Sequence, residues 1–442
     1  MDIKQIKKKD AVIKTPFGKK TIVYADYSAS GRPSNTIDKQ LDKILPYYAN
    51  THSNAALGQK MSNMIEQVRK DIKLFFTMPK NSIVLFQGTG ASGAISQLVH
   101  CLNITTKDTA VFISEIEHHS NLLPWLPYKP TVIPLTADLL YIDVVAFENS
   151  LKKCTKSKKI ASFCAVSNVT GIIQPVKDLI KIAHKYDCRI ILDDAAGAPY
   201  IDLSVRPDAL VFSPHKMKGG QGCPGVLISS PTLFESRVPY VSGGGTVRFV
   251  CKHGAEYSKK IETRESGGSP NVIGIARLGL VLKHIKRQKM SVFKKINAYM
   301  AKRLLKMQHI KLAVPESATV LNRLPVWSFI VTINGEIIHY NLVVAILNDV
   351  FGIQSRGGIS CASFYAQRIF GIHSATLKKL DEMFGNDCSE YGWVRISLAG
   401  TTSKKVQRFI CDAISQLPAL ITKYKTFYKY DRTHNRFVFK QK

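Results

Sequence analysis

The sequence predicts an α/β protein, with a large domain built on a mainly parallel sheet and a smaller α+β domain. Two observations lead to this fold class. Short apolar β-branched runs alternate with helical patterns from about residue 21 to 230, and longer helices with a second group of strands follow. Strands joined by helical crossovers form parallel sheets that are buried on both faces. A chain of 442 residues is long enough to bury such a core.

The expected strands of the large domain are apolar runs of five to nine residues. They lie at 21–26, 82–87, 109–114, 131–135, 159–167, 189–194, 208–213 and 225–230. Helices are expected between them, for example at 92–101 and 176–186. In sheets of this kind, ligands bind outside the carboxyl ends of the strands. The residues that directly follow each run are therefore the first candidates for a site.

The second half of the chain predicts the smaller domain. The segment from Gly274 to about Lys311 has a period near 3.6 and indicates one long helix or a pair of helices. Strands follow at 325–333 and 392–400, and helices at about 339–351, 374–384 and 403–417. We place the large domain at 21–285 and the small domain at 286–422 together with 1–20. The basic, aromatic tail at 423–442 has a composition compatible with disorder.

Composition excludes several classes of protein. Hydrophobic residues at 45% and charged residues at 21% are ordinary globular values and exclude a wholly disordered chain. No apolar run approaches the roughly 18 residues of a membrane-spanning helix, and the start of the chain lacks the apolar stretch of a secretory signal. The nine cysteines are scattered without a C-x-x-C pair, so neither disulfides nor a metal site is indicated. We expect a soluble intracellular protein, most simply cytoplasmic, with no membrane partner.

The formal charge of +30 comes from 62 Lys and Arg against 32 Asp and Glu. Ten of the basic residues and no acidic residue lie between Lys283 and Lys311. Clustered cations suit a polyanion such as a phosphate backbone or an anionic membrane. Net charge alone says little about specificity, however, and lysine-rich surfaces are common. We favour a surface property, suited at most to an acidic partner, and do not expect nucleic acid as a partner.

Two strand ends carry residues suited to chemistry on a carbonyl compound. In "ALVFSPHKMKGGQG", Lys216 follows His215 at the end of an apolar run, where a partly desolvated amine can form a Schiff base. In "ILDDAAGAPY", Asp193 ends the preceding run and could pair with a protonated ring nitrogen. The alternatives are an exposed loop lysine and a carboxylate that caps a helix.

Three further strand ends add to this group. "FQGTGASGAI" places Thr89 and Gly90 where backbone amides at a helix N-terminus could approach a phosphate, although a plain tight turn is the simpler interpretation. "ISEIEHHSNLLPW" offers His118, whose flat ring could stack on an aromatic ring, whereas a metal site would need further ligands. Asn168 in "CAVSNVTG" could hold a phenolic or carboxylate oxygen or satisfy a turn.

In order and spacing, these strings resemble the class V aminotransferases, and within that family the cysteine desulfurase and selenocysteine lyase branch. The resemblance runs from about Tyr24 to Leu417. It implies the fold type I of enzymes that depend on pyridoxal 5'-phosphate, with that cofactor bound. It implies that Lys216 is the Schiff-base lysine and that Asp193 is the partner of the ring nitrogen. It also implies that His118 stacks on the ring and that Asn168 lies near the ring hydroxyl and the substrate. The residues that it places around the phosphate are Thr89, Gly90, Ser213 and His215. "RESGGSPNVIG" looks like the segment that reaches the phosphate from a neighbouring subunit, which places Ser269 there and implies a homodimer.

The branch is indicated by "QSRGGISCASF", where Arg356 precedes Cys361 by five residues. Sulfur transfer needs an accessible thiolate on a loop, although without the resemblance a lone cysteine would be a small buried hydrophobe. Arg395 in "WVRISLAGTTS" matches the arginine that holds the substrate carboxylate. "ANTHS" loosely matches the segment that brings His52 toward substrate. Ala196 stands where the family usually has a glutamine that contacts the ring hydroxyl.

The resemblance therefore implies a cysteine desulfurase that depends on pyridoxal phosphate. It would convert the small-molecule substrate L-cysteine to L-alanine and leave a persulfide on Cys361, which an acceptor thiol or a sulfur-acceptor protein would discharge. One alternative, motivated by Ala196, is another reaction of the same family: transamination, epimerisation or lysis of selenocysteine. Another is an inactive descendant that binds nucleic acid through its basic surface. The complete set of motifs argues against this second alternative.

Overall fold

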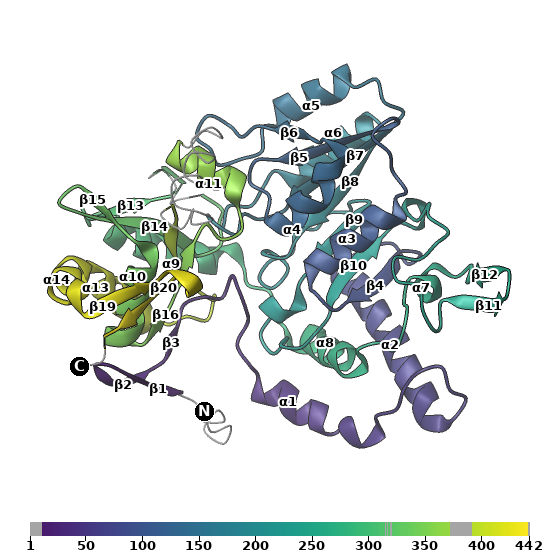
Figure 1. The fold of residues 1–442 in the computed structure, drawn as a ribbon, viewed down its shortest axis with the longest axis horizontal. Helices are drawn as coiled ribbons and strands as arrows, with labels where there is room; N and C mark the ends of the chain where they lie inside the picture. The colour runs from purple at the N-terminus through teal and green to yellow at the C-terminus, as the bar shows by residue number, and fades with distance from the viewer. Residues whose placement is uncertain (1–10, 314, 316, 319–320, 372–390, 441–442) are drawn as a thin grey trace.

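The computed structural model describes residues 11–313, 315, 317–318, 321–371 and 391–440. The helix expected at 374–384 lies outside these residues. Figure 1 shows a larger unit, in blue and teal, beside a smaller one that contains both ends of the described chain.

The large unit is built on a seven-stranded sheet in the order β4-β10-β9-β8-β7-β5-β6. In that order the strands are Ile83–Gln87, Gly225–Ser229, Ala209–Phe212, Cys188–Asp193, Lys158–Cys164, Thr109–Ser114 and Thr131–Ile133. Strand β10 is antiparallel to both of its neighbours, and the other pairs are parallel. The predicted α/β class with a mainly parallel sheet is therefore confirmed.

Helices cover both faces of this sheet (Figure 1). They are α1 (Asn35–Asp42), α2 (Ala56–Phe75), α3 (Ala91–Cys101), α5 (Val144–Lys153), α6 (Val176–Lys185) and α8 (Val272–His284). Phe147 of α5 and Phe163 of β7 belong to the core on one face, whereas Ile95 of α3 packs with Val211 of β9 on the other. Every residue of β9 and β10 is buried. This burial explains their continuous apolar runs.

The run at 21–26 was expected to be a strand of this sheet, and that expectation is wrong. Its first residue ends β2 (Gly18–Thr21), and Val23–Tyr24 (β3) pairs in parallel with Ile353–Gln354 (β16), outside the large sheet. The next residue, Ala25, is fully buried in the core of the small unit together with Ile353. The apolar side chains of this run therefore find their partners in the small unit.

The small unit has a second sheet in the order β13-β14-β18-β17, with β15 also paired to β14. These strands are Ile310–Leu312, Val326–Ile333, Trp393–Ser397, Arg356–Gly358 and Glu336–Ile338. Its helices are α9 (Met290–Leu304), α10 (Tyr340–Phe351), α13 (Lys404–Ser415) and α14 (Leu417–Tyr424). Trp327, Ile346 and Ile410 lie in its core. The segment from 274 to 311 was predicted to form one long helix or a pair of helices, and it forms the pair α8 and α9.

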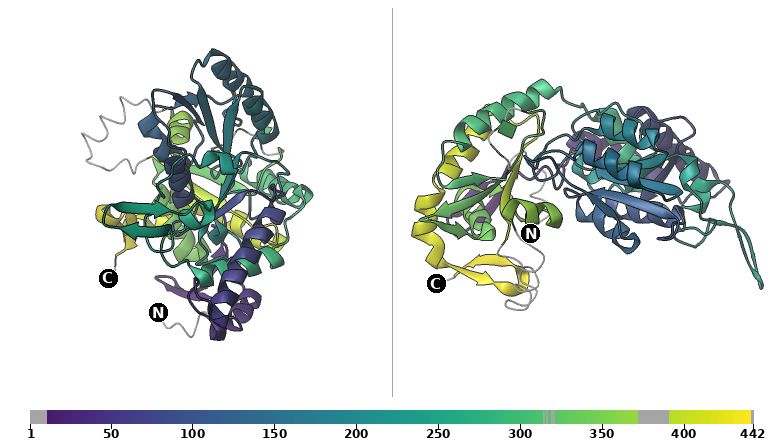
Figure 2. Two further views of the ribbon diagram at one scale, coloured as in Figure 1. Left: turned by 90° about the vertical axis from the view of Figure 1, so that its right-hand side faces the viewer. Right: turned by 90° about the horizontal axis from the view of Figure 1, so that it is seen from above.

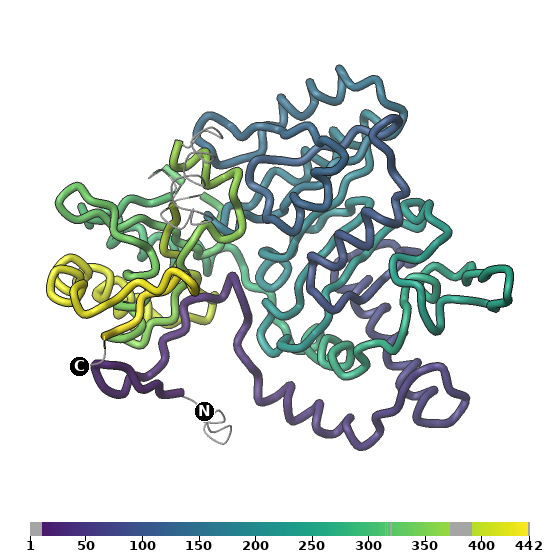
Figure 3. Tube along the Cα trace, viewed as in Figure 1, coloured from purple at the N-terminus to yellow at the C-terminus, as the bar shows by residue number. Residues whose placement is uncertain are grey.

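Both ends of the described chain pack on this unit. The first residues form a hairpin of β1 (Val12–Thr15) and β2 (Gly18–Thr21), and the tail forms another of β19 (Tyr428–Asp431) and β20 (Arg436–Phe439). Figure 3 shows the two segments, purple and yellow, next to each other. Phe17 contacts Phe439 with ring centroids 5.5 Å apart. In the described residues the tail is folded, with its aromatic side chains packed on the domain.

Candidate active site

A cavity of about 1020 Å³ lies where the carboxyl ends of the parallel strands meet the small unit. It brings together nine residues singled out from the sequence. They are Thr89, His118, Asn168, Asp193, Ser213, His215, Lys216, Cys361 and Arg395. The strand ends of a parallel sheet share one edge, which is why residues so far apart in the sequence converge here.

Lys216 lies in a short 3-10 turn, Pro214–Lys216, directly after β9. Its side chain is partly accessible from the cavity. Burial lowers the pKa of its ammonium, and the carboxylate of Asp193 acts in the opposite direction. A lysine whose pKa is lowered in this way has more neutral amine at neutral pH, which is the nucleophilic form.

Asp193 ends β8 and is almost fully buried. Its Oδ1 accepts a hydrogen bond from the backbone N–H of Ala195 at 2.9 Å. Burial raises the pKa of this carboxyl, while Ala195 and Lys216 lower it. A positively charged group within the cavity would balance the negative charge of the Asp193 carboxylate.

A second carboxyl group, that of Glu117, lies behind the residues that line the cavity and is completely buried. It accepts hydrogen bonds from Asn121 Nδ2 at 2.6 Å and from the Ser114 hydroxyl. Burial raises its pKa to about 8, against the effect of those hydrogen bonds. Glu117 is therefore mostly protonated at neutral pH and adds little negative charge beside Asp193.

The start of α3 forms a cradle suited to an anion. Gly90 has φ +66, and a Cβ placed there would lie 3.1 Å from Ser213 Oγ and 3.3 Å from His215 Cε1. The N–H of Ala91 donates to Ser213 Oγ at 2.9 Å, and Thr89 lines the cavity beside it. Backbone amides and hydroxyls at the N-terminus of an eleven-residue helix form a good phosphate site. Only glycine leaves room for this approach.

His118 presents a neutral ring to the cavity. Its Nδ1 accepts from the N–H of Ser120 at 3.1 Å and so caps the short helix α4 (His119–Leu122). Burial, followed by the charge of Lys216, lowers its pKa to about 3. A fixed, uncharged imidazole of this kind suits stacking on an aromatic ring.

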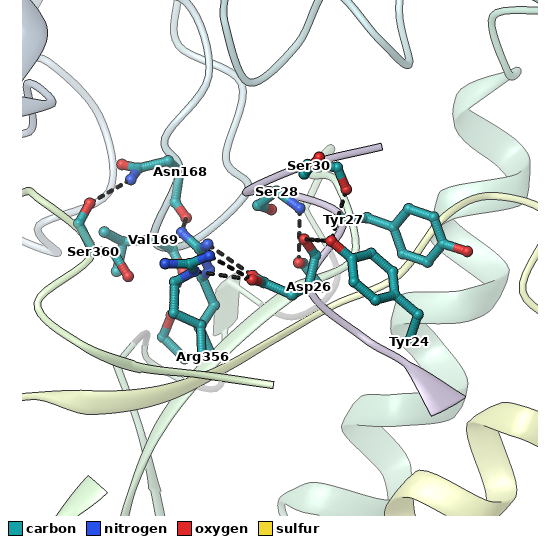
Figure 4. Close-up of polar contacts among 12 residues, drawn as sticks. Tyr24, Asp26, Tyr27, Ser28, Ser30, Asn168, Val169, Arg356 and Ser360 are labelled. Carbon is teal, nitrogen blue, oxygen red and sulfur yellow. Dashed lines mark hydrogen bonds and ion pairs between the residues drawn. The ribbon is translucent and has the colours of Figure 1, made fainter. Parts of the chain in front are cut away.

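Cys361 lies on an exposed but anchored loop. Ser360 and Cys361 both have φ +55, in the left-handed region that costs a non-glycine residue of order 1 kcal/mol or more. Two bonds from the large unit hold this backbone. The N–H of His119 donates to Cys361 O at 2.7 Å, and Asn168 Nδ2 donates to Ser360 O at 2.7 Å. Figure 4 shows the second of these bonds.

Two cysteines line the cavity, and only one has an accessible thiol. Cys164 ends β7, is buried, and has its pKa raised well above the usual value by burial and by the carboxyl groups of Glu117 and Asp193. Cys361 is exposed. Since the thiolate is the nucleophile in sulfur chemistry, Cys361 is the candidate and Cys164 is not.

Two arginines share a carboxylate that sequence reasoning missed. Asp26 Oδ1 accepts from Arg395 Nη2 at 3.1 Å. Its Oδ2 accepts from Arg356 Nε at 2.9 Å, a contact shown in Figure 4. Arg395 Nη1 also donates to Asn168 O at 3.1 Å. The Nε of Arg395 is buried and has no hydrogen-bond partner among the described residues. An unsatisfied guanidinium N–H on a residue that lines a cavity is suited to a carboxylate ligand.

Two predicted residues line a different cavity. Ser269 and His52 line a second cavity of about 480 Å³, together with Gly88. Ser269 Oγ accepts from Asn50 Nδ2 at 3.2 Å. Within one chain, neither His52 nor Ser269 lines the first cavity, and the roles that the resemblance implies for these two residues stay predictions.

The family model of the aminotransferases class V matches residues 23–409, which is most of the chain. The chain belongs to the class V aminotransferase family. A cysteine desulfurase of Wigglesworthia glossinidia brevipalpis is 26% identical over 399 residues, which cover 84% of this chain and 91% of that protein. A cysteine desulfurase of Escherichia coli O157:H7 is 27% identical over 361 residues, covering 77% and 84%.

Solved structures agree with the family at the level of fold. The apo structure of a cysteine desulfurase from Thermococcus onnurineus NA1 has a TM-score of 0.74 at 24% identity and covers 90% of this chain and 95% of its own. Among the described residues, no three His, Cys, Asp or Glu side chains are grouped to hold a metal ion. No described helix is long and apolar enough to span a membrane.

Two features set this cavity apart, of which the motifs indicated only the first. Ala196 lines the cavity, so a methyl group stands where the family usually has an amide. The tail hairpin adds Arg432, Thr433 and Asn435 to the wall, although it lies beyond the part that the family model matches. Asp26, in contrast, had a usable signal, since it is an acid at the end of an apolar run.

Proposed function

We propose that this class V protein is a cysteine desulfurase that binds pyridoxal 5'-phosphate and removes sulfur from L-cysteine. The products would be L-alanine and a persulfide on Cys361. The observation that carries the proposal is one cavity lined by an accessible thiol, a lysine of lowered pKa and a buried arginine with an unused donor.

The residues of the cavity fit the parts of this cofactor. The cradle at Gly90 and Ser213 would hold the phosphate, Asp193 would pair with the ring nitrogen, and His118 would lie against the ring. Lys216 would attach to the aldehyde. When bound, pyridoxal phosphate draws electrons from the substrate Cα, which makes the Cα proton acidic.

The chain's own residues would position the substrate and move its proton. Arg395 would bind the α-carboxylate through Nε, while its other donors stay on Asp26 and Asn168. The amine of Lys216, with a pKa lowered by burial, would take the proton from Cα and deliver protons to the product.

Cys361 would receive the sulfur. Its thiolate attacks the sulfur atom of cysteine, a new S–S bond forms, and the bond between that sulfur and Cβ breaks. The electron pair of the broken bond stays with Cβ, which takes up a proton and becomes the methyl group of alanine. The sulfur remains on Cys361 as a persulfide.

The test is to measure sulfide and alanine together in the presence of a reducing thiol. Cys361→Ser should keep the bound cofactor and lose both products. Cys251→Ser, which changes the exposed cysteine of β11 (Val247–Cys251), is the matched control and should keep them. Normal sulfide release by Cys361→Ser would remove Cys361 from the mechanism. Borohydride reduction should fix the cofactor to the peptide of Lys216, and an unlabelled peptide would refute that assignment.

Ala196 favours a second candidate within the family. Because the side chain that usually contacts the ring hydroxyl is missing, another reaction such as transamination, epimerisation or selenocysteine lysis could replace desulfuration. A panel of amino acids resolves this question. Alanine from L-cysteine supports our proposal, whereas keto acid, racemised substrate or activity on selenocysteine alone supports the second candidate.

We also propose a homodimer. Ser269 and His52 lie outside the cavity of their own chain, and the hairpin of β11 and β12 (Gly254–Tyr257) carries Phe249 at 53% and Val250 at 68% exposure. Exposed apolar side chains on a projecting hairpin suit a partner surface. Light scattering should give twice the mass of one chain, and a monomeric mass in the active enzyme would refute the proposal.

A further inference from the structure

The C-terminal hairpin, made of β19 and β20, forms part of the wall of the active-site cavity. Arg432, Thr433 and Asn435, at its turn, line the same cavity as Cys361. Figure 2 shows the hairpin in yellow at the end of the chain. The match to the family model ends at residue 409, so this wall lies beyond the matched part of the chain.

The hairpin is fixed to the domain rather than loosely attached. Asn341 Nδ2, at the start of α10, donates to Asn435 Oδ1 at 2.9 Å. At the other end, the Tyr428 hydroxyl donates to Asp349 Oδ2 at 2.8 Å. With these two attachments on α10, the turn has a defined place beside the cavity.

The basic side chains at this turn differ in whether they have a carboxylate partner. His434 Nδ1 and Arg436 Nε lie 2.8 and 3.2 Å from Asp431 Oδ2, so both have a carboxylate partner. Arg432 is exposed and lines the cavity, and within the described part of the chain it has neither an ion pair nor a hydrogen bond from its side chain. The cavity wall therefore presents a guanidinium group that is available to a ligand.

The carboxylate of the amino-acid substrate has a better-suited partner than Arg432. The donor suited to that group is on Arg395, which is 3% exposed, whereas Arg432 lies on an exposed turn. A small molecule that approaches Cys361 after the first reaction would enter a cavity that Arg432 also lines. Guanidinium binds carboxylate, sulfonate and phosphate oxygens through paired N–H donors.

We propose that Arg432 binds the small acceptor thiol that removes sulfur from Cys361, and that it selects thiols carrying an additional anionic group. This inference rests on the proposed function. The acceptor thiolate attacks the terminal sulfur of the persulfide and forms a new S–S bond. The bond between that sulfur and Cys361 Sγ breaks, and its electron pair leaves with Cys361 as a thiolate. No other oxidant or reductant is required.

The experiment compares two thiols of similar size that differ in charge. The holoenzyme is loaded with L-cysteine, freed of excess substrate, and mixed with 2-mercaptoethanesulfonate or 2-mercaptoethanol. The loss of the Cys361 persulfide is followed by mass spectrometry of the peptide. Arg432→Gln should lower the ratio of the sulfonate rate to the hydroxyl rate about fivefold, and raising the salt concentration should lower the wild-type ratio similarly. The ratio cancels the amount of persulfide loaded, and comparing the ratio between variants cancels the different reactivity of the two thiols.

Lys429→Gln removes one positive charge from an exposed position on the same hairpin and is the matched control. Its ratio should equal that of the wild type. An unchanged ratio in Arg432→Gln, or an equal fall in Lys429→Gln, would overturn the proposal.

A second readout separates this inference from the proposed function. The unloaded thiol of Cys361 is modified with an anionic aromatic disulfide, 5,5'-dithiobis(2-nitrobenzoate), or with the neutral 2,2'-dithiodipyridine, in a Cys251→Ser background. Arg432→Gln should slow the anionic reagent selectively. If no persulfide forms from cysteine but this selectivity is present, the proposed function fails and the anion site stands. If persulfide forms but both comparisons show no charge preference, the anion site fails.

Discussion

Replacing the buried Glu117 with glutamine should stabilise the protein increasingly as the pH rises. Glu117 lies at 1% exposure behind Asp193, and burial raises its pKa from 4.5 to about 8. The native state therefore holds this proton more tightly than the unfolded chain does. The contribution of Glu117 to the free energy of unfolding is fully present below pH 4.5. It is lost as the pH rises toward 8, because Glu117 ionises at a lower pH in the unfolded chain than in the native state. Glutamine keeps the shape of the side chain and has no proton to lose.

The magnitude follows from the same two pKa values. A shift of one unit corresponds to about 1.4 kcal/mol, so the whole interval from 4.5 to about 8 corresponds to about 5 kcal/mol at high pH. Between pH 5 and pH 8, where the protein is conveniently handled, the change is about 3 to 4 kcal/mol. The amide of glutamine can retain both hydrogen bonds, because its oxygen can accept from Asn121 and its nitrogen can donate to Ser114.

The assay is urea unfolding of both proteins at several pH values, with the free energy of unfolding compared at each. The difference between Glu117→Gln and the wild type should grow by about 3 to 4 kcal/mol from pH 5 to pH 8. Glu336→Gln, which changes an exposed carboxylate in β15, controls for the loss of a surface charge. A difference that stays level with pH, or a trend shared by both variants, would refute the reasoning.

Three further substitutions have defined outcomes. Asp26→Asn should raise KM for L-cysteine by roughly an order of magnitude, since Arg395 loses a charged hydrogen bond; an unchanged KM in steady-state assays would contradict this. Gly90→Ala, at φ +66 with only 3.1 Å to Ser213 Oγ, should weaken retention of pyridoxal phosphate at least tenfold during dialysis, because the cradle must open. Tyr428→Phe should lower the free energy of unfolding by about 1 to 2 kcal/mol in urea, through loss of the bond to Asp349, and a stability equal to that of the wild type would count against the anchored hairpin.

Much of the site was predictable because it follows from local pattern. Lys216, Asp193 and Asn168 each come soon after an apolar run, and the ends of parallel strands meet at one edge. The orientation of β10 had no such signal. Its side chains are buried on both faces, so the sequence is continuously apolar whichever way the strand runs.

Other features depend on contacts that no local pattern records. Asp26 and Arg356 lie 330 residues apart and meet because β3 and β17 both belong to the small unit. The C-terminal hairpin was expected to allow disorder because its sequence is short, basic and aromatic. Its order depends on partners elsewhere, including Phe17 and Asp349. A short segment gains its stability from such tertiary contacts rather than from its own propensity.

Under the proposed function, Asn168 would join two tasks, namely binding the substrate carboxylate and placing the nucleophile. Its backbone oxygen accepts from Arg395, and its side-chain amide donates to Ser360 O, next to Cys361. A substrate carboxylate that fixes Arg395 therefore also steadies the residue that holds the Cys361 loop. Cysteamine, which is cysteine without that carboxylate, should lose kcat as well as affinity, because the thiol is less often in position. If cysteamine raises only KM and leaves kcat at the value for L-cysteine, the two tasks are independent and this coupling is wrong.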